Sequence, residues 1–536
     1  MPLDPLLCAA FLVVPWLWPF TSGPLAPVQP YLVSVVAAAA LLACLGRSGG
    51  EGGAVVARGW LAAAVVSSCI GLLQYFNLEG ALHPWVNAAE PGTAFGNLRQ
   101  PNQLATLLVM GLMALRWRAQ TGDAWHNLRV AGAAALLMVG LAASASRIGL
   151  VELAALCAVA LMWARAARRG LRATGMGALW VAAVYAVAAL VLPALLQWAE
   201  GIDGRSMVDR LQHAESTCGS RLILWSNVID LIRQKPWTGW GWGELAYAHY
   251  ITLYDGPRFC HILDNAHNLP LHLAVELGVP VAVLACGAIG GLIWRGRPWA
   301  ETDPTRQLAW GVLLAIGLHS LVEYPLWYGP FQIAVGLCIW MLWTTPRRPA
   351  GTGSYQPDSD LPLSASPSEA STGPSPASAV RLTIAAAMLA ALAYAGWDYH
   401  RISQIYLPAE QRSAWYRDDA MGNAQKSWLF ADSVRFAEVT TRPVTRDNAP
   451  WMLLESLKAL HFSPEPRVIT KVIESATVLG REDLAIAHLA RFKAAFPEKY
   501  RQWSDDNRRM AERVTEFLQG GASAASADSA ASAASQ

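Results

Sequence analysis

Long apolar stretches separated by short polar connections make up most of this chain. A transmembrane helix needs about 20 predominantly apolar residues, and inside a bilayer the backbone must satisfy its own hydrogen bonds. The pattern therefore predicts an all-α polytopic membrane protein with about eleven transmembrane helices. The expected spans are 6–20, 29–45, 54–74, 102–115, 130–145, 149–164, 174–198, 268–294, 308–322, 329–345 and 379–397.

The pattern changes after the tenth span, and this change predicts the domain organisation. Residues 1–345 form the membrane domain, with one large polar loop at 199–267. The Pro/Ser/Gly-rich segment 346–378 predicts a disordered cytoplasmic linker. The last span, 379–397, is followed by charged, amphipathic helical sequence at 398–518, which predicts a small soluble helical domain. The final residues, 519–536, are low in complexity and predict a disordered tail.

Composition agrees with a membrane protein and narrows its partners. Of the 536 residues, 54% are hydrophobic and only 15% are charged, which excludes a disordered chain and an ordinary soluble enzyme. The net charge of +2 gives no reason to expect a nucleic-acid partner. The expected surroundings are a lipid bilayer, and the 24 Trp fit anchoring at its interfaces.

The distribution of arginine predicts the orientation of the spans. Alternate connections carry clusters such as Arg116, Arg118 and Arg129, whereas the opposite short connections offer only Arg99 and Arg147. The positive-inside rule then puts the N-terminus in the cytoplasm and the C-terminus on the other side. The loops expected on that other side are 75–101, 143–148, 199–267 and 319–330.

Polar residues that are unusual in a helical bundle gather on this non-cytoplasmic side. They occur in FGNLRQPNQLAT, SASRIG, TCGSRLILW, HILDNAHN and HSLVEYPLWY. Five converging connections are typical of the lining of an external cavity. A proton-coupled transporter would instead place ionisable groups in the middle of its spans, where this sequence has few.

Two arginines in these connections are candidates for phosphate binding. Guanidinium binds phosphate oxygens in a bidentate way and stays charged at any relevant pH. Arg147 at a span junction could equally be an interfacial residue that snorkels, and Arg221 could be an ordinary residue of a surface helix. Both interpretations stay open from the residues alone.

His267 begins a second candidate group where the chain re-enters an apolar helix. A neutral imidazole can accept a proton or bind substrate near neutral pH. A metal site with His261 and Asp264 is the alternative, but the spacing matches no standard zinc pattern. The neighbouring polar candidates could bind substrate or simply cap helices and anchor at the interface. They are Gln100, Asn102, Gln103, Asn268 and Tyr324.

Taken together, these motifs resemble the O-antigen ligase and polymerase superfamily of bacterial inner membranes. The resemblance rests on GNLRQPNQLAT, SASRIGLVE, GSRLILWSNVIDLIRQKPWTGWGWGEL, AHNLPLHLAVELGVP and HSLVEYPLWYGPF. The ligase-type pattern is His-Asn-x9-Gly-x-x-small. The chain matches it at His267, Asn268 and Gly278 and departs from it at Val281, where a small residue is expected. Within the superfamily, the chain looks most like the PglL-type protein O-oligosaccharyltransferases.

The resemblance implies a GT-C-like fold and a metal-independent glycosyltransferase that uses no cofactor. The donor would be a glycan on undecaprenyl diphosphate. The acceptor would be Ser or Thr of an exported protein, such as pilin, at the periplasmic face. By matching motif, Arg147 and Arg221 would bind the diphosphate and His267 would be the essential histidine. Gln100 and Tyr324 also match functional positions of the family.

Three other functions remain as alternatives. An O-antigen ligase would transfer the glycan to lipid A–core, and an O-antigen polymerase would extend a glycan chain. A lipid-linked sugar transporter would need symmetrical broken helices and polar sites at mid-membrane. The long soluble C-terminal region favours a protein acceptor.

Cys218 and Cys260 are the only cysteines predicted outside the membrane. In an oxidising compartment they could form a disulfide that ties together the two edges of the polar loop.

Overall fold

The computed structural model describes residues 5–21, 23–45, 52–121, 127–168, 170–202, 218–347 and 376–533. Every regular element in these ranges is a helix, which confirms the expected all-α fold class. The chain divides into two compact units. The first unit contains residues 1–215, 267–272 and 280–420, and the second contains 216–266, 273–279 and 421–536.

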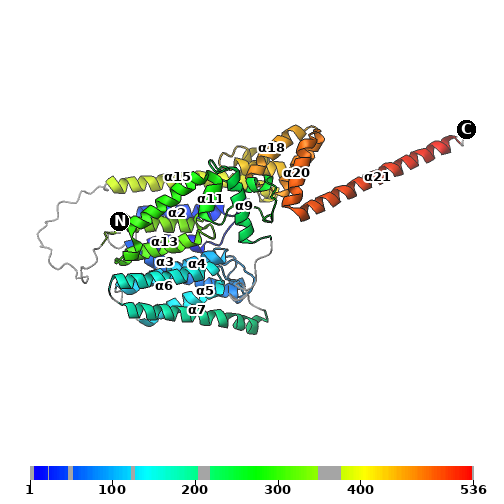
Figure 1. The fold of residues 1–536 in the computed structure, drawn as a ribbon. Helices are drawn as coiled ribbons and strands as arrows, with labels where there is room; N and C mark the ends of the chain where they lie inside the picture. Colours follow the sequence, from blue (N-terminus) through cyan, green and yellow to red (C-terminus); the bar gives the residue numbers. More distant parts are fainter. Residues whose placement is uncertain are drawn as a thin grey trace. The chain divides into compact units, whose positions relative to one another are not determined.

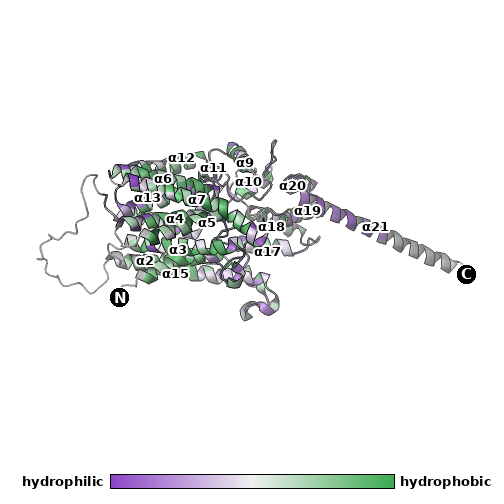
Figure 2. Ribbon diagram, turned by 90° about the horizontal axis from the view of Figure 1, so that it is seen from below, coloured by the Kyte–Doolittle hydropathy of each residue, from purple (hydrophilic) through white to green (hydrophobic). Residues whose placement is uncertain are grey.

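The first unit is a bundle of long apolar helices that lie side by side (Figure 1). Its members are α1 (Pro5–Leu17), α2 (Val28–Leu45), α3 (Gly52–Tyr75), α4 (Pro101–Thr121), α5 (Asn127–Ser144), α6 (Arg147–Ala166), α7 (Leu171–Glu200), α12 (Val279–Gly296), α13 (Pro304–His319), α14 (Gly329–Thr344) and α15 (Pro376–Ser403). Hydrophobic residues dominate these helices, as Figure 2 shows most clearly for α3 to α7.

Helix α4 is the centre of this bundle. It packs against α3, α5, α6 and α13, and residues 103–115 are buried without interruption. A helix that is covered on all sides can carry polar residues only where they find partners within the protein. The first turn of α4 therefore supplies polar groups to the interior of the bundle.

The helices of the structure occur at all eleven predicted spans. Among the described residues, five helical stretches are long and apolar enough to cross a membrane: Gly52–Tyr75, Arg147–Ala166, Leu171–Glu200, Val279–Ala300 and Ser378–Tyr406. Shorter apolar helices occupy Leu6–Leu17, Val28–Cys44, Leu128–Ser144 and Gly329–Thr344. These features are consistent with a membrane protein, and the count of eleven transmembrane helices stays a prediction.

The prediction of one continuous helix over 268–294 is wrong. The structure has two helices there, α11 (Leu269–Leu277) and α12, with a break at Gly278. Gly278 has a φ of +91°, and a Cβ at this position would clash with the carbonyl of Trp237. Hydrophobicity alone could not predict the break, because its cause is the close approach of the distant segment 236–241. That segment pairs with α11 through two backbone hydrogen bonds, from Trp240 to Val275 and from Gly241 to Glu276, and with the start of α12 through a third, from Val279 to Pro236.

The second unit is built from two distant parts of the chain. One part is the polar loop, with α9 (Arg221–Gln234) and α10 (Leu245–Ile251). The other is the C-terminal helical segment, whose main helices are α17 (Ala431–Thr441), α18 (Ala449–Phe462), α19 (Pro466–Val478), α20 (Glu482–Ala495) and α21 (Pro497–Ala533). Tyr250 of α10 is buried in the same hydrophobic core as Val468, Val472 and Phe492. The loop is therefore part of the core of the C-terminal helices.

A buried histidine, His488, also joins these parts of the second unit, and a second one, His249, lies within the polar loop. The Tyr250 hydroxyl and His488 Nδ1 are 2.9 Å apart, and Arg491 donates to the Ile251 carbonyl at 2.9 Å. Burial, helped by the charge of Arg258, lowers the pKa of His249 to about 3. Burial and Arg491 lower the pKa of His488 to about 4. Both imidazoles are therefore neutral in the folded protein near neutral pH.

The described residues cover the predicted domains only in part. The linker 346–378 lies almost entirely outside the described residues. Residues 398–420 belong to the first unit, and the C-terminal part of the second unit begins at Met421. A soluble domain over 398–518 stays a prediction. The backbone of α21 is helical as far as Ala533, within the predicted tail 519–536. Alanine favours a helix more than any other residue, which accounts for this backbone, and disorder of the tail stays a prediction.

We expect Gly278→Ala to destabilise the protein strongly. An L-residue in the left-handed region costs about 1–2 kcal/mol, and the clash with the Trp237 backbone adds to this cost. Thermal unfolding of the purified protein in detergent measures the effect. Gly287→Ala is the matched control, because Gly287 lies in α12 with open space around its Cβ position. Equal melting temperatures for the two variants would contradict the close packing at Gly278.

The second unit should lose stability in acid. A histidine with a lowered pKa in the folded state contributes no penalty above the unfolded value near 6.5 and destabilises the fold increasingly as pH falls below it. For His249 and His488 this loss reaches the order of a few kcal/mol by about pH 4. Melting temperatures between pH 7 and pH 4 measure it. His488→Gln, which keeps an acceptor for Tyr250, should show a smaller loss in acid, whereas substitution of the exposed His83 should leave the pH dependence unchanged.

Candidate functional site

His267 lies directly before α11, in a segment held firmly against the residues that follow α13. The Leu269 N–H donates to the Ser320 carbonyl at 2.8 Å, and Asn268 Nδ2 donates to the Leu321 carbonyl at 2.9 Å. Asn268 Oδ1 also accepts from Leu271 N–H at 3.0 Å, as the cap of α11. Both ends of the Asn268 amide thus have structural partners.

The imidazole of His267 contacts a carboxylate that the sequence did not single out. His267 Nδ1 lies 2.8 Å from Glu323 Oε2. The Glu323 side chain is only 4% exposed, whereas that of His267 is 21% exposed. The ring of Tyr324 packs edge-on against the imidazole with centroids 4.8 Å apart, and Tyr328 stacks on Tyr324. The structure therefore brings together the predicted His267 and Tyr324. We call these two side chains and Glu323 the His267 group.

The predicted Asn102 belongs to the same group. Asn102 Nδ2 donates to the second oxygen of Glu323 at 3.2 Å, and Asn102 Oδ1 accepts from Ser146 Oγ at 2.7 Å. Ser146 is the N-cap of α6 and accepts from the Gly149 N–H. Arg147, an exposed residue, is the first residue of that helix. One hydrogen-bonded chain thus connects His267 with the helix that carries Arg147.

A second polar cluster lies deeper in the bundle. Thr106 Oγ1, one turn after Asn102 on α4, lies 2.8 Å from both Glu152 Oε1 and His319 Nδ1. All three side chains are buried. The hydroxyl has one proton and can donate to only one acceptor, and the Asn102 carbonyl at 3.2 Å is a further acceptor beside it. The cluster joins α4, α6 and α13 below the His267 group.

Gln100 and Gln103 frame the start of α4. Gln100 is half-buried, and its carbonyl accepts from the N–H groups of Gln103 and Leu104. The preceding turn is fixed by buried Gln74, which bonds the backbone of Phe95 and Gly96. Gln103 is buried, and no hydrogen-bond partner for its Nε2 is found within the described ranges. The substrate contacts proposed for both glutamines stay predictions.

Arg221 lies in the second unit, as the first residue of α9. Ser220 is the N-cap and accepts from the Ile223 N–H at 3.3 Å. Arg147 and Arg221 thus share one arrangement, in which a Ser N-cap precedes an arginine at the first helical position. The N-terminus of a helix carries partial positive charge and disfavours a cation, but it binds anions well. The role of the two arginines in diphosphate binding stays a prediction.

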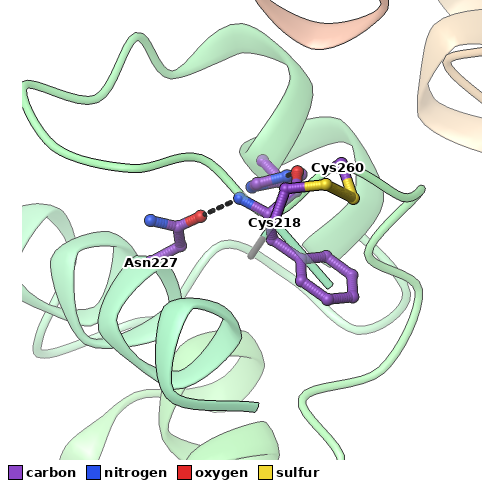
Figure 3. Close-up of a disulfide and its surroundings, with 5 residues drawn as sticks. Cys218, Asn227 and Cys260 are labelled. Carbon is purple, nitrogen blue, oxygen red and sulfur yellow. Dashed lines mark hydrogen bonds between the residues drawn. A yellow bond between two sulfur atoms is a disulfide. The ribbon is translucent and has the colours of Figure 1, made fainter. Parts of the chain in front are cut away.

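A disulfide and a buried asparagine fix the loop around Arg221 (Figure 3). Cys218 and Cys260 are joined, with their Cα atoms 5.4 Å apart. Asn227 of α9 accepts from the Phe259 N–H at 2.8 Å and donates to the Pro257 carbonyl at 3.0 Å. Trp225 Nε1 donates to the carbonyl of Ala266, the residue before His267. The start of α9 is therefore tied both to Cys260 and to the residue that leads into the histidine.

Sequence reasoning missed Glu323 because an acidic residue at the end of an apolar span looks like an interfacial residue. Its position directly before Tyr324, within a segment otherwise rich in aromatic residues, was the available signal. The alternative metal site is not assembled: in the described parts of the chain, no group of three or more His, Cys, Asp or Glu side chains could hold a metal ion.

Three family models match consecutive, separate parts of the chain. Residues 94–119 match a model described as protein glycosylation ligase, and residues 132–286 match one described as O-antigen ligase. Residues 307–511 match a model described as virulence factor membrane-bound polymerase, C-terminal. The chain is therefore placed in the O-antigen ligase and polymerase superfamily, which confirms the resemblance seen in its motifs.

Within that superfamily the chain is PglL-like. It is 27% identical over 291 residues to the general O-oligosaccharyltransferase of Acinetobacter baylyi (strain ATCC 33305 / BD413 / ADP1), covering 52% of this chain and 49% of that protein. It is also 27% identical over 121 residues to the ComP-specific O-oligosaccharyltransferase of the same strain, covering 22% of each chain. The alignments thus span about half, or less, of the curated relatives.

Proposed function

We propose that this protein is a protein O-oligosaccharyltransferase of the bacterial inner membrane. It transfers a preassembled glycan from undecaprenyl diphosphate to a Ser or Thr hydroxyl of an exported protein such as pilin. The observation that carries the proposal is His267, held by a buried carboxylate and packed against Tyr324, in a chain whose relatives are named O-oligosaccharyltransferases.

The chemistry needs a base for the acceptor hydroxyl. The hydroxyl oxygen forms a bond to the anomeric carbon of the glycan, while the bond from that carbon to the phosphate oxygen breaks. Undecaprenyl diphosphate leaves with the bonding electrons, and the hydroxyl proton passes to His267. The accepting atom would be Nε2, because Nδ1 is bonded to Glu323. A positioned general base contributes typically about 10²–10⁴-fold to such a reaction.

The leaving diphosphate needs positive charge, which Arg147 and Arg221 supply in this proposal. Negative charge grows on the leaving oxygen in the transition state, and preorganised donors aimed at it lower the barrier. Each arginine adds a guanidinium to the N-terminal N–H groups of its helix, so both kinds of donor face an anion. This pair of cations is the reason why we propose a metal-independent enzyme.

The proposed topology follows from the arginine distribution in the sequence. The N-terminus is cytoplasmic, and His267, the polar loop and the C-terminal helices are periplasmic. The periplasm is an oxidising compartment, in which the Cys218–Cys260 disulfide persists. Gln100, Gln103 and Tyr324 remain proposed contacts for the donor or acceptor, whereas Asn102 and Asn268 have the structural partners described above.

An O-antigen ligase is the second candidate, favoured by the match of residues 132–286 to the O-antigen ligase model. The two candidates share the donor and the proposed chemistry and differ in the acceptor. A lipid A–core molecule that gains the glycan, with no modified protein, would favour the ligase. A glycan that only lengthens on its lipid would favour a polymerase.

Expression of the gene in a host with a lipid-linked glycan pathway and no transferase of its own tests the function. We expect a pilin or another periplasmic protein to gain the mass of the glycan on Ser or Thr, as measured by intact-protein and peptide mass spectrometry. His267→Ala should reduce the transfer rate by about 10²-fold or more at equal expression, because the general base is lost. His261→Ala is the control, since His261 is exposed and a loop neighbour in sequence. Full activity of His267→Ala would contradict the assignment.

The arginines should not tolerate lysine. Arg147→Lys and Arg221→Lys keep the charge but lose the two-pronged donor, so we expect each to lower the transfer rate by at least about tenfold. Rates with a purified lipid-linked donor measure this loss. Arg165→Lys is the matched control, because Arg165 is an exposed residue near the other end of the same helix as Arg147. Wild-type rates in both test variants would rule out bidentate binding.

A further inference from the structure

We propose that Glu323 is a positioning residue that fixes the tautomer and the orientation of His267. The inference rests on the proposed function for its catalytic consequence, and on the hydrogen bonds of the first unit for its geometry.

Burial forces the Glu323 carboxylate to find partners. A charged group taken out of water is costly unless it is paired and hydrogen-bonded. The carboxylate meets this need with His267 Nδ1 on one oxygen and Asn102 Nδ2 on the other. The backbone N–H of Glu323 donates to the His319 carbonyl at 2.9 Å, which fixes the main chain as well. The carboxylate therefore has a defined position from which it can orient the imidazole.

The direction of every hydrogen bond in this group follows from its chemistry. The ionised Glu323 carboxylate can only accept, so Asn102 faces it with its NH₂ group and turns Oδ1 to Ser146. Ser146 Oγ accepts from the Gly149 N–H and gives its own proton to Asn102. Asn102 receives that proton on Oδ1, which leaves its NH₂ group facing Glu323. The orientation of the amide is thus set by Glu323 on one side and matched by the N-cap of α6 on the other.

The same logic assigns the proton on His267. An ionised carboxylate only accepts hydrogen bonds, so Nδ1 of a neutral His267 must carry the proton. Nε2 is then the nitrogen with a lone pair, which a general base requires. In serine proteases an acidic residue holds the catalytic histidine in its working tautomer in this way.

The backbone at His267 supports a functional constraint on its position. His267 has a φ of +49°, which is uncommon for a residue other than glycine. Such conformations persist where surrounding bonds determine them, and they cluster at functional sites. Here the bonds from Asn268 and Leu269 to the Leu321 and Ser320 carbonyls hold the segment. The imidazole is directed at Glu323 by the main chain as well as by its own hydrogen bond.

Glu323→Gln gives a specific test because the carboxamide has one acceptor and one donor end. Asn102 presents its NH₂, so the new oxygen must accept from Asn102 and the new NH₂ must face His267 Nδ1. His267 would then hold its proton on Nε2, which is the wrong tautomer for a base. We expect kcat to fall by about 10²-fold or more with KM for the lipid-linked donor within about twofold of wild type.

The double variant E323Q/N102D should recover part of the lost rate. An aspartate at position 102 accepts from the carboxamide NH₂ at position 323, so the carboxamide oxygen turns to His267 Nδ1 and restores the working tautomer. We expect at least about a tenfold gain in kcat over Glu323→Gln alone, a partial return of the general-base contribution. A merely structural role would predict further loss, because the second substitution moves a buried charge. A double variant that is no more active than Glu323→Gln would overturn the proposal. A wild-type kcat in Glu323→Gln, or an effect of this substitution on KM alone, would overturn it as well.

Glu301→Gln is the matched control for loss of a buried carboxylate. Glu301 is buried in the same unit, and its Oε2 accepts from Arg306 Nε at 2.7 Å, with no bond to the His267 group. This variant should lower the melting temperature but keep kcat per folded molecule. If Glu323→Gln does not fold, Glu323→Asp takes its place, since it keeps the charge but withdraws it from the imidazole. A wild-type kcat in Glu323→Asp would then overturn the proposal.

A measurement without substrate separates this inference from the proposed function. Hydrogen–deuterium exchange at histidine Cε1, followed by mass spectrometry, reports the state of each imidazole. We expect Glu323→Gln to change the exchange rate of His267 by at least about twofold and to leave exposed His261 unchanged. An unchanged rate at His267 would overturn the positioning role even if the protein transfers glycan. Conversely, if Glu323→Gln changes the His267 exchange rate but the wild-type protein transfers no glycan, the orienting contact is upheld and the proposed activity is rejected.

Discussion

The burial of the Glu323 carboxylate is the constraint on which the His267 group depends. A buried carboxylate needs donors, and in this structure the donors come from the segment before α11 and from the first turn of α4. Asn102 is in turn oriented by Ser146 at the start of α6. One charge thus couples three separate connections of the bundle. Because the partners satisfy each other's hydrogen bonds, a shift in any one of these helices would leave a polar group buried without its bond. Any movement of the group therefore requires its members to move together.

Much of the fold could be predicted from the sequence because hydrophobicity is a local property. A helix such as α7 can be predicted from its 30 residues of mainly apolar sequence alone. The break at Gly278 could not be predicted in this way, because it depends on contact with Trp237, about forty residues earlier in the chain. The motif pattern had marked Gly278 as a family position, but only the structure shows why glycine is needed there.

The candidate site shows the same division between local and distant information. His267, Tyr324 and Asn102 could be selected from their residue types and their positions at the ends of apolar spans, and the structure places them together. Glu323 could not be selected, since its role depends on a partner 56 positions away. Asn268 was selected for substrate, but it caps α11 and bonds the Leu321 carbonyl. The two arginines share the Ser-Arg helix start, a local signal that was present in the sequence as SASRIG and TCGSRLILW.

The C-terminal helices of the second unit are not a separable module. Tyr250 and its neighbours Tyr247 and Ile251 come from the polar loop, yet they pack in the hydrophobic core formed by α17 to α20. The Glu244–His461 ion pair and the bond from Arg491 to Ile251 cross the same seam. A hybrid protein that exchanged residues from 421 onward alone would pair one core surface with a foreign one. The loop from Cys218 to Ala266 and the C-terminal helices therefore have to be exchanged together, although more than 150 residues of sequence separate them.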